Sequence, residues 1–233
     1  MPCTLPASLA DAAVCRGSFH AVLGGEAGEA VFADFSAALQ KAQAEGRILT
    51  ASLFRYENHL FFYAEGLNRP FTPQGLCPAL DAALLPWPPA LGEAAPRPWA
   101  AMQPYFYHDV PTTAADWQRG RCPQRRRGRI ALLPPDSWCS YMEHHLRIVT
   151  EGLVEGDRWH LICVQEGVLF SYLEEPRTNV NIKHQPGAHS PELDAWIAAD
   201  PESHFARFTP EQKAHPDSSH NFVFLPRIAG TED

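Results

Sequence analysis

Residues 60–65 read LFFYAE and residues 169–174 read LFSYLE, so the pattern Leu-Phe-x-Tyr-x-Glu occurs twice with an offset of 109 residues. Two further matches lie on either side of this pattern, at offsets of 110 and 113 residues. They pair Glu45-Gly46 with Glu155-Gly156, and PALDA at residues 78–82 with PELDA at residues 191–195. Three matches in the same order at a nearly constant offset indicate an internal duplication.

Both copies show the hydrophobic patterns of strands and helices in the order βαββαβ. In the first copy we expect a strand at 19–23, a helix with apolar residues Val31, Phe35, Leu39 and Ala42, a hairpin that turns at 56–58, a helix from Pro78, and a last strand at 105–107. In the second copy we expect a strand at 130–133, a helix capped at 136–137 with a core stripe of Met142, Leu146, Val149 and Leu153, a hairpin that turns at 165–167, a helix from 190–192, and a last strand at 222–225.

This order predicts an α+β fold made of two tandem ferredoxin-like units. One such unit covers one face of its sheet with helices and leaves the other face as an apolar surface. We therefore expect the two copies to pack sheet to sheet as an α+β barrel within the chain. The expected parts are a first repeat at 16–111, a linker at 112–128 and a second repeat at 129–229. A monomer, or a dimer formed through other surfaces, follows from this arrangement.

The composition is that of a globular protein: of 233 residues, 45% are hydrophobic and 20% are charged. The net charge of −8 argues against a dedicated nucleic-acid-binding protein. There is no run of about 20 uncharged apolar residues and no basic segment ahead of an apolar one, so we expect a cytoplasmic protein without a membrane partner. The common nucleotide-binding and hydrolase motifs are absent from the sequence.

Three groups of residues could suggest other chemistry. The arginines of the linker region could contact phosphate or nucleic acid, but without interleaved aromatic residues a solvated connector is the favoured interpretation. These are Arg119, Arg121, Arg125, Arg126, Arg127 and Arg129. The six cysteines form no CxxC pair, so we expect reduced thiols and no zinc site. The loop histidines His184, His189, His215 and His220 have no metal-ligand spacing, and we expect neither a metal nor an organic cofactor.

The candidate site residues lie in the second copy. Tyr141 and His145 are four residues apart and share a helix face, next to Trp138 and Ile148, whereas His144 is expected to point to solvent. The corresponding positions of the first copy are approximately Val31 and Phe35, which are apolar, so we expect one site per chain. His160 lies in an apolar strand pattern that is compatible with a side chain directed into the barrel.

These residues carry a family resemblance: the second copy, from about residue 129 to 228, is similar to the L-rhamnose mutarotase family of dimeric α+β barrels. The matching features are Tyr141-x-x-x-His145, the helix end at Gly156, the hairpin at 168–172, and AWIAADPESHFARF at 195–208. The resemblance implies that His145 is the acid/base group and that Tyr141 lies beside it on the substrate. Phe205, with His204 beside it, stands where the family has tryptophan in contact with the sugar.

The resemblance implies a cofactor-free isomerase that interconverts the anomers of a reducing sugar such as L-rhamnose. A histidine suits this reaction because its ordinary pKa lies close to neutral pH. His160, His204 and Phe205 would then contact the small-molecule substrate. Two alternatives stay open, namely a haem-binding barrel with a single histidine ligand and a non-catalytic barrel that binds a small ligand.

Overall fold

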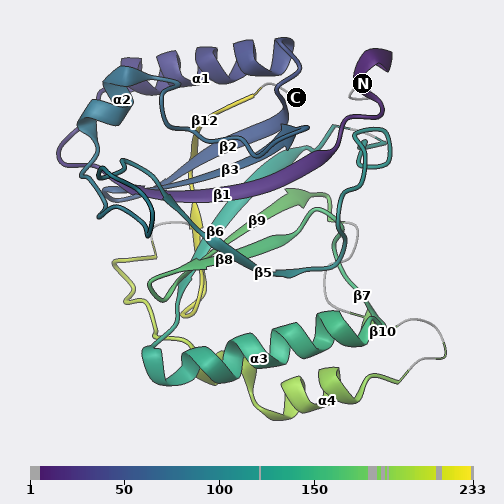
Figure 1. Cartoon of the computed structure of the whole chain (residues 1–233). Coiled ribbons are helices and arrows are strands. Elements are labelled where there is room, and N and C mark those ends of the chain that lie inside the picture. The colour runs from purple at the N-terminus through teal and green to yellow at the C-terminus, as the bar shows by residue number, and fades with distance from the viewer. Residues whose placement is uncertain are drawn as a thin grey trace. The chain divides into compact units, whose positions relative to one another are not determined.

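The structure is a computed structural model that describes residues 6–120, 122–177, 183–184, 187, 189–213 and 217–231 (Figure 1). The chain divides into two compact units. Unit 1 comprises Met1–Met102, Pro111–Pro123 and Pro226–Asp233, and unit 2 comprises Gln103–Val110 and Gln124–Leu225. Each unit is therefore discontinuous along the chain, whereas the repeats expected from the sequence are continuous.

Unit 1 is a five-stranded antiparallel sheet with two helices. Its strands are β1 (Val14–Val22), β2 (Ile48–Tyr56), β3 (His59–Leu67), β4 (Ala100–Ala101) and β12 (Arg227–Gly230), and they lie in the order β12-β2-β3-β1-β4. Its helices are α1 (Glu29–Ala44) and α2 (Pro78–Ala83), with a short 3-10 helix, η1 (Ala7–Leu9), near the N-terminus. The hairpin of β2 and β3 turns at Glu57 and Asn58, as the sequence predicts.

Unit 2 repeats this arrangement. Its strands are β5 (Gln103–Tyr107), β6 (Arg125–Leu132), β8 (Leu161–Gln165), β9 (Val168–Glu175) and β11 (Val223–Leu225), in the order β11-β6-β9-β8-β5. Its helices are α3 (Pro135–Glu151), α4 (Pro191–Ala198) and the short 3-10 helix η2 (Pro201–His204). A two-stranded sheet joins β7 (Val154–Glu155) and β10 (Lys183–His184). The predicted α+β fold of two ferredoxin-like units is confirmed by the matching strand orders.

Each five-stranded sheet receives its fifth strand from the other half of the sequence. We expected 105–107 to close the first repeat; instead β5 pairs with β8 at the edge of the second sheet. The strand that closes the first sheet beside β1 is the short β4. In the same way β11 closes the second sheet beside β6, and the chain then continues into β12, which pairs with β2. The expected last strand was therefore assigned to the wrong sheet.

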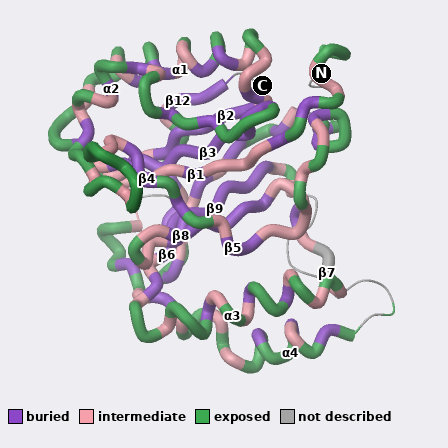
Figure 2. Tube along the Cα trace, viewed as in Figure 1, coloured by how far each residue is buried: buried purple, intermediate pink, exposed green. Residues whose placement is uncertain are grey.

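Each long helix has one stripe of buried residues. In α1 the buried residues are Phe32, Phe35, Leu39 and Ala42, close to the predicted set. In α3 the buried residues are Tyr141, His145 and Ile148, whereas Leu146 of the predicted stripe is 61% exposed. Figure 2 shows the mainly buried strands and the exposed outer faces of the helices. The core stripe of α3 is thus the face of the candidate site itself.

Three of the linker arginines that the structure describes are buried or paired within a unit. Arg119 is buried in unit 1, and both of its Nη atoms donate to the carboxylate of Glu65. In unit 2, Arg126 is buried and Arg127 pairs with Glu175 at 2.8 Å. For Arg126 and Arg127 the expectation was wrong because strand β6 already begins at Arg125 and pairs these residues with β9, whereas Arg121 lies outside the described residues.

The cysteines also depart from expectation at one position. Cys122 takes part in a disulfide bond, whereas Cys15, Cys77, Cys139 and Cys163 are free. Cys3 lies outside the described residues. Because disulfides are rare in reducing compartments, this bond does not fit the expected set of reduced thiols. Within the described part of the chain, no helix is long and apolar enough to span a membrane.

Candidate functional site

Tyr141 and His145 lie one turn apart on the buried face of α3, and their ring centroids are 4.3 Å apart. Both side chains are almost fully buried, with exposed fractions of 3% and 4%. A tyrosine and a histidine rarely form the centre of a helix–sheet core unless their polar atoms have partners. The polar atoms of this pair therefore define what the site can do.

Aromatic side chains from two other elements, β5 and α4, surround His145. Phe106 of β5 and Trp196 of α4 each have a ring centroid 4.6 Å from that of His145, and both contacts are edge-on. Tyr105 of β5 contributes a third edge-on contact at 5.6 Å. Strand β5 thus carries two of the three neighbours, and the sequence prediction missed them because it placed this strand in the first repeat.

One nitrogen of His145 is committed to the helix backbone. Nδ1 donates to the carbonyl oxygen of Tyr141 at 3.0 Å, since a carbonyl only accepts. Nε2 is then the acceptor nitrogen, and the described residues provide it with no hydrogen-bond donor. Burial lowers the pKa of His145 from 6.5 to about 4, helped by the neighbouring His144, His204 and His108. The imidazole is therefore neutral at pH 7.

The hydroxyl of Tyr141 belongs to a second polar group. The ring of Tyr105 lies 6.1 Å from that of Tyr141, and Arg129 of β6 lies close enough to influence both phenols. Burial raises the pKa of Tyr141 to about 12 and lowers the pKa of Arg129 to about 10. At pH 7 both phenols are protonated and the guanidinium is charged. Arg129 also stacks over the ring of Phe222 at 4.3 Å.

The predicted residues His204 and Phe205 lie at the edge of this cluster. Phe205 is buried, with its ring 5.1 Å from that of Tyr141, and the ring of His204 is 5.8 Å from it. His204 Nε2 lies 3.3 Å from Ser140 Oγ. We expected His144 to point to solvent; it is half-buried, 5.4 Å from Trp196 and 6.5 Å from His204. The cluster thus reaches the surface through two half-buried histidines.

His160, the remaining predicted residue, lies just before β8 and not within a strand. It is buried, and its ring is 6.1 Å from Phe106, which in turn contacts His145. All five predicted site residues therefore lie in one part of unit 2, with His160 joined to the others through Phe106. The sequence prediction missed Trp196, although it lies in the segment that carries the family resemblance.

Three aromatic rings lie around the imidazole of His145. They are those of Tyr141, Phe106 and Trp196, with centroids 4.3–4.6 Å from that of His145. Within the described ranges, no group of three or more His, Cys, Asp or Glu side chains is placed to hold a metal ion. Of the loop histidines considered for a metal, His215 and the side chain of His184 lie outside the described residues.

The counterpart of this site in unit 1 is apolar. The ring of Phe35 in α1 packs against Phe62 at 5.8 Å and against Trp99 at 6.3 Å. These residues belong to a hydrophobic cluster between the helices and the sheet of unit 1. The hydrogen-bonding groups of α3 therefore have no equivalent at this position of α1, in line with the difference between the two copies in sequence.

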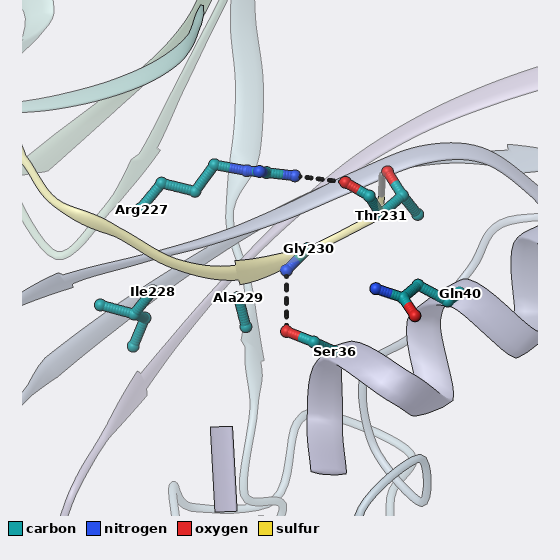
Figure 3. A pocket seen from close by; sticks show the side chains of 7 residues that line it. All are labelled: Ser36, Gln40, Arg227, Ile228, Ala229, Gly230 and Thr231. Carbon is teal, nitrogen blue, oxygen red and sulfur yellow. Dashed lines mark hydrogen bonds between the residues drawn. The ribbon is translucent and has the colours of Figure 1, made fainter. Parts of the chain in front are cut away.

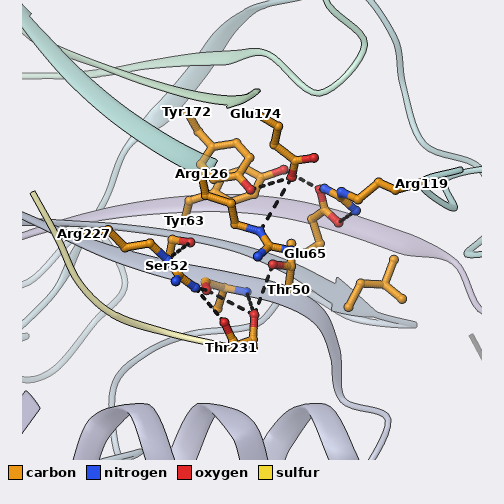
Figure 4. A network of polar contacts seen from close by, with 12 residues as sticks. Thr50, Ser52, Tyr63, Glu65, Arg119, Arg126, Tyr172, Glu174, Arg227 and Thr231 are labelled. Carbon is orange, nitrogen blue, oxygen red and sulfur yellow. Dashed lines mark hydrogen bonds and ion pairs between the residues drawn. The ribbon is translucent and has the colours of Figure 1, made fainter. Parts of the chain in front are cut away.

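The duplicated Tyr-x-Glu motif forms a buried polar row on the opposite face of each sheet (Figure 4). In unit 1 the hydroxyl of Tyr63 donates to Glu65 at 2.7 Å, and Glu65 also accepts from Trp117 Nε1 and Arg119. These partners lower the pKa of Glu65 to about 2, against the raising effect of burial. In unit 2 the hydroxyl of Tyr172 donates to Glu174 at 2.6 Å. Paired in this way, both carboxylates are structural groups of the sheets.

Two pockets on the described residues both lie in unit 1. The first, of about 360 Å³, lies between α1 and β12 (Figure 3). Its polar groups are already used within the chain, because Arg227 donates to Ser52 and to the carbonyl of Thr231, and Gly230 N donates to Ser36. The second, of about 470 Å³, lies between the last turns of α1 and the loop that follows β3.

Comparison with known proteins finds no matching family model and no matching curated protein. Among solved structures, the chain is similar to a Lactobacillus acidophilus NCFM protein provisionally described as a monooxygenase, with 7% identity and a TM-score of 0.39, over 94% of this chain and 96% of the other. It is also similar to an anthrone oxidase-like protein, with 7% identity and a TM-score of 0.38, over 99% and 94%. At these values neither likeness carries an argument about function. The strand orders of the two sheets define a duplicated α+β protein with two ferredoxin-like units.

Proposed function

We propose that unit 2 binds a small, largely aromatic organic molecule that carries a hydroxyl group, next to Tyr141 and His145. The observation that carries this proposal is the bare Nε2 of a neutral, buried His145 within a group of aromatic rings. An acceptor in such surroundings is satisfied by a ligand hydroxyl, and aromatic rings are suited to contact the body of the ligand.

The number of polar groups favours an aromatic ligand over a sugar. A sugar presents a hydroxyl on almost every carbon, and each buried hydroxyl needs a partner. The site offers one imidazole acceptor, the hydroxyls of Tyr105 and Tyr141, and the guanidinium of Arg129, among six aromatic walls. The walls are Phe106, Tyr105, Tyr141, Trp196, Phe205 and Phe222.

Sugar mutarotation, which the family resemblance implies, is the second candidate, and it is favoured by the direct contact of Tyr141 with His145. General acid–base catalysis is most effective when the pKa of the catalytic group lies near the working pH. Burial lowers the pKa of His145 to about 4, which makes it a weak base and an almost unpopulated acid at pH 7. This is why we place ligand binding ahead of isomerase activity.

A matched pair of ligands tests the proposal: 2-naphthol has the hydroxyl, and 2-methoxynaphthalene has the same ring system without a donor. Binding is followed by isothermal titration calorimetry and by the fluorescence of Trp196, assigned with a Trp196→Phe variant. We expect 2-naphthol to bind about tenfold more tightly, the usual worth of one buried hydrogen bond. In His145→Phe, which keeps the packing and removes the acceptor, the two ligands should bind equally.

Equal affinity of the wild-type protein for both ligands would contradict the role of His145 as acceptor.

The sugar alternative is tested separately by saturation-transfer NMR on L-rhamnose and other reducing sugars. Acceleration of anomer exchange that is lost in His145→Ala would favour the isomerase over the binding protein. A control variant, Trp138→Ala, lies on the exposed start of α3 and should leave both measurements unchanged.

A further inference from the structure

The 470 Å³ pocket of unit 1 gathers positive charge on an acidic protein. Its lining includes Lys41, Arg47 and Arg69 against a single carboxylate, Glu45, whereas the chain as a whole carries a net charge of −8. The volume lies within the ordinary range for small-molecule sites. A local excess of cations in an otherwise negative protein attracts anions selectively.

The three cations are not equally available. Lys41 and Arg47 both approach Glu45, at 3.9 Å and 3.3 Å, so one carboxylate is shared between them. Arg69 is exposed, and among the residues that the structure describes its guanidinium has neither an ion-pair nor a hydrogen-bond partner. Arg69 thus adds to the pocket lining a planar guanidinium that has no partner within the described chain and matches carboxylate and phosphate oxygens.

The loop that carries Arg69 is fixed to the sheet. A Cβ atom on Gly66 would lie 2.4 Å from the carbonyl oxygen of Arg69, so only glycine allows this close approach. Asn68 is anchored on both sides, because its N–H donates to the carbonyl of Ala13 and its side-chain oxygen accepts from the N–H of Ala13. A ligand that binds Arg69 therefore has little backbone order to impose.

The far end of the loop is fixed as well. Asp81 of α2 accepts from Gly75 N at 2.6 Å and from Trp99 Nε1 at 3.0 Å. Between the two anchors, Phe71 is buried with Arg47 stacked over its ring at 5.4 Å, and Leu76, directly after the second anchor, is half-buried. The pocket thus combines an apolar wall with two guanidinium groups.

We propose that this pocket binds a small organic anion, with a phosphate or carboxylate held by Arg69 and Arg47 and an apolar part against Phe71 and Leu76. The proposal is independent of the ligand site in unit 2. Arg69 is the main anion contact in this proposal, since Arg47 and Lys41 are already paired with Glu45.

Phenyl phosphate and inorganic phosphate are the probes, titrated into the full chain at low ionic strength and followed by amide chemical shifts. We expect saturable binding of phenyl phosphate, with shifts centred on residues 69–76 and an affinity about tenfold above that of inorganic phosphate, because only the phenyl ring reaches the apolar wall. Arg69→Ala should weaken phenyl phosphate at least about tenfold, the worth of a charge-assisted hydrogen bond.

The matched control is Arg55→Ala, which removes the same charge from strand β2 of the same unit, outside the pocket. It should bind phenyl phosphate like the wild-type protein. Binding that does not saturate, shifts centred away from residues 69–76, or equal losses in the two variants would overturn the proposal. A melting temperature unchanged in Arg69→Ala shows that the fold is intact when binding is measured.

Discussion

Protonation of His145 should destabilise the protein as the pH falls below 6.5. Burial lowers its pKa in the folded chain from 6.5 to about 4, so the unfolded chain binds this proton more tightly than the folded chain does. The stabilising contribution is complete above pH 6.5 and is lost progressively as the pH falls toward 4. From these two values, about 2.5 kcal/mol of the free energy of unfolding should be lost between pH 7 and pH 4.5.

The assay compares urea unfolding of the wild-type protein and of His145→Gln at pH 7, 6, 5 and 4.5. Glutamine does not titrate, and the other acid-sensitive groups, such as Glu65, are common to both proteins and cancel in the difference. We expect the stability difference between the two proteins to change in favour of the variant by about 2.5 kcal/mol over this range. The pKa itself is measured from the ¹³Cε1 chemical shift of His145.

A stability difference that stays constant from pH 7 to pH 4.5 would refute this reasoning, as would a His145 imidazole that titrates near 6.5. Either result would mean that the ring is hydrated in solution and not enclosed by Phe106 and Trp196. The neutral acceptor on which the proposed ligand site rests would then be lost as well, although the anion pocket of unit 1 would be unaffected.

Three further predictions concern the fold. Glu65→Gln leaves Arg119 buried without its counter-charge, so it should cost about 3–5 kcal/mol in the free energy of unfolding measured with urea; a loss below 1 kcal/mol would contradict the buried pair. Gly66→Ala forces a Cβ against a backbone oxygen and should lower the melting temperature by several degrees, whereas Gly17→Ala on the neighbouring strand, with its nearest contact at 3.5 Å, should change it little. Ser190→Ala removes the hydroxyl that caps α4 and donates to Glu151, and it should cost at least about 1 kcal/mol in the free energy of unfolding; an unchanged stability would contradict both contacts.

The sequence was sufficient for elements whose pattern is local. The two hairpins were placed correctly because each has an apolar run on both sides of a polar turn, and the turn residues Glu57 and Glu166 have the positive φ that such turns require. Helix α1 was placed correctly because its buried residues are all apolar. A pattern of this kind depends only on near neighbours in the chain.

Helix α3 shows where such a pattern fails. Leu146 is apolar but 61% exposed, while His145 beside it is 4% exposed. A hydropathy pattern counts histidine as polar and so rotates the predicted core stripe by one residue. A neutral imidazole whose Nδ1 is bonded to the helix backbone packs as an aromatic ring, and that state depends on partners far away in the sequence, such as Phe106 and Trp196.

The exchange of edge strands was beyond local prediction for a related reason. The aromatic run at 105–107 favours a strand at either sheet edge, so the sequence predicts a strand there without indicating its partner. Short β4 offers only two paired residues, and it leaves no local signal that the chain moves on to a second sheet. The partner of an edge strand is decided by tertiary packing.

The two copies share the same residues on one face of their sheets and differ on the face that the helices cover. This difference separates structural from functional residues. The shared Tyr-x-Glu rows have their hydroxyl and carboxylate groups bonded to each other within each unit, so they need no outside ligand. The helix-covered faces differ: Phe35 belongs to a hydrophobic cluster, whereas His145 has a nitrogen acceptor among aromatic rings. An acceptor that the chain leaves without a donor is available to a ligand that supplies one. The difference between the copies therefore points to α3, and not to the shared motif, as the place where this protein acts.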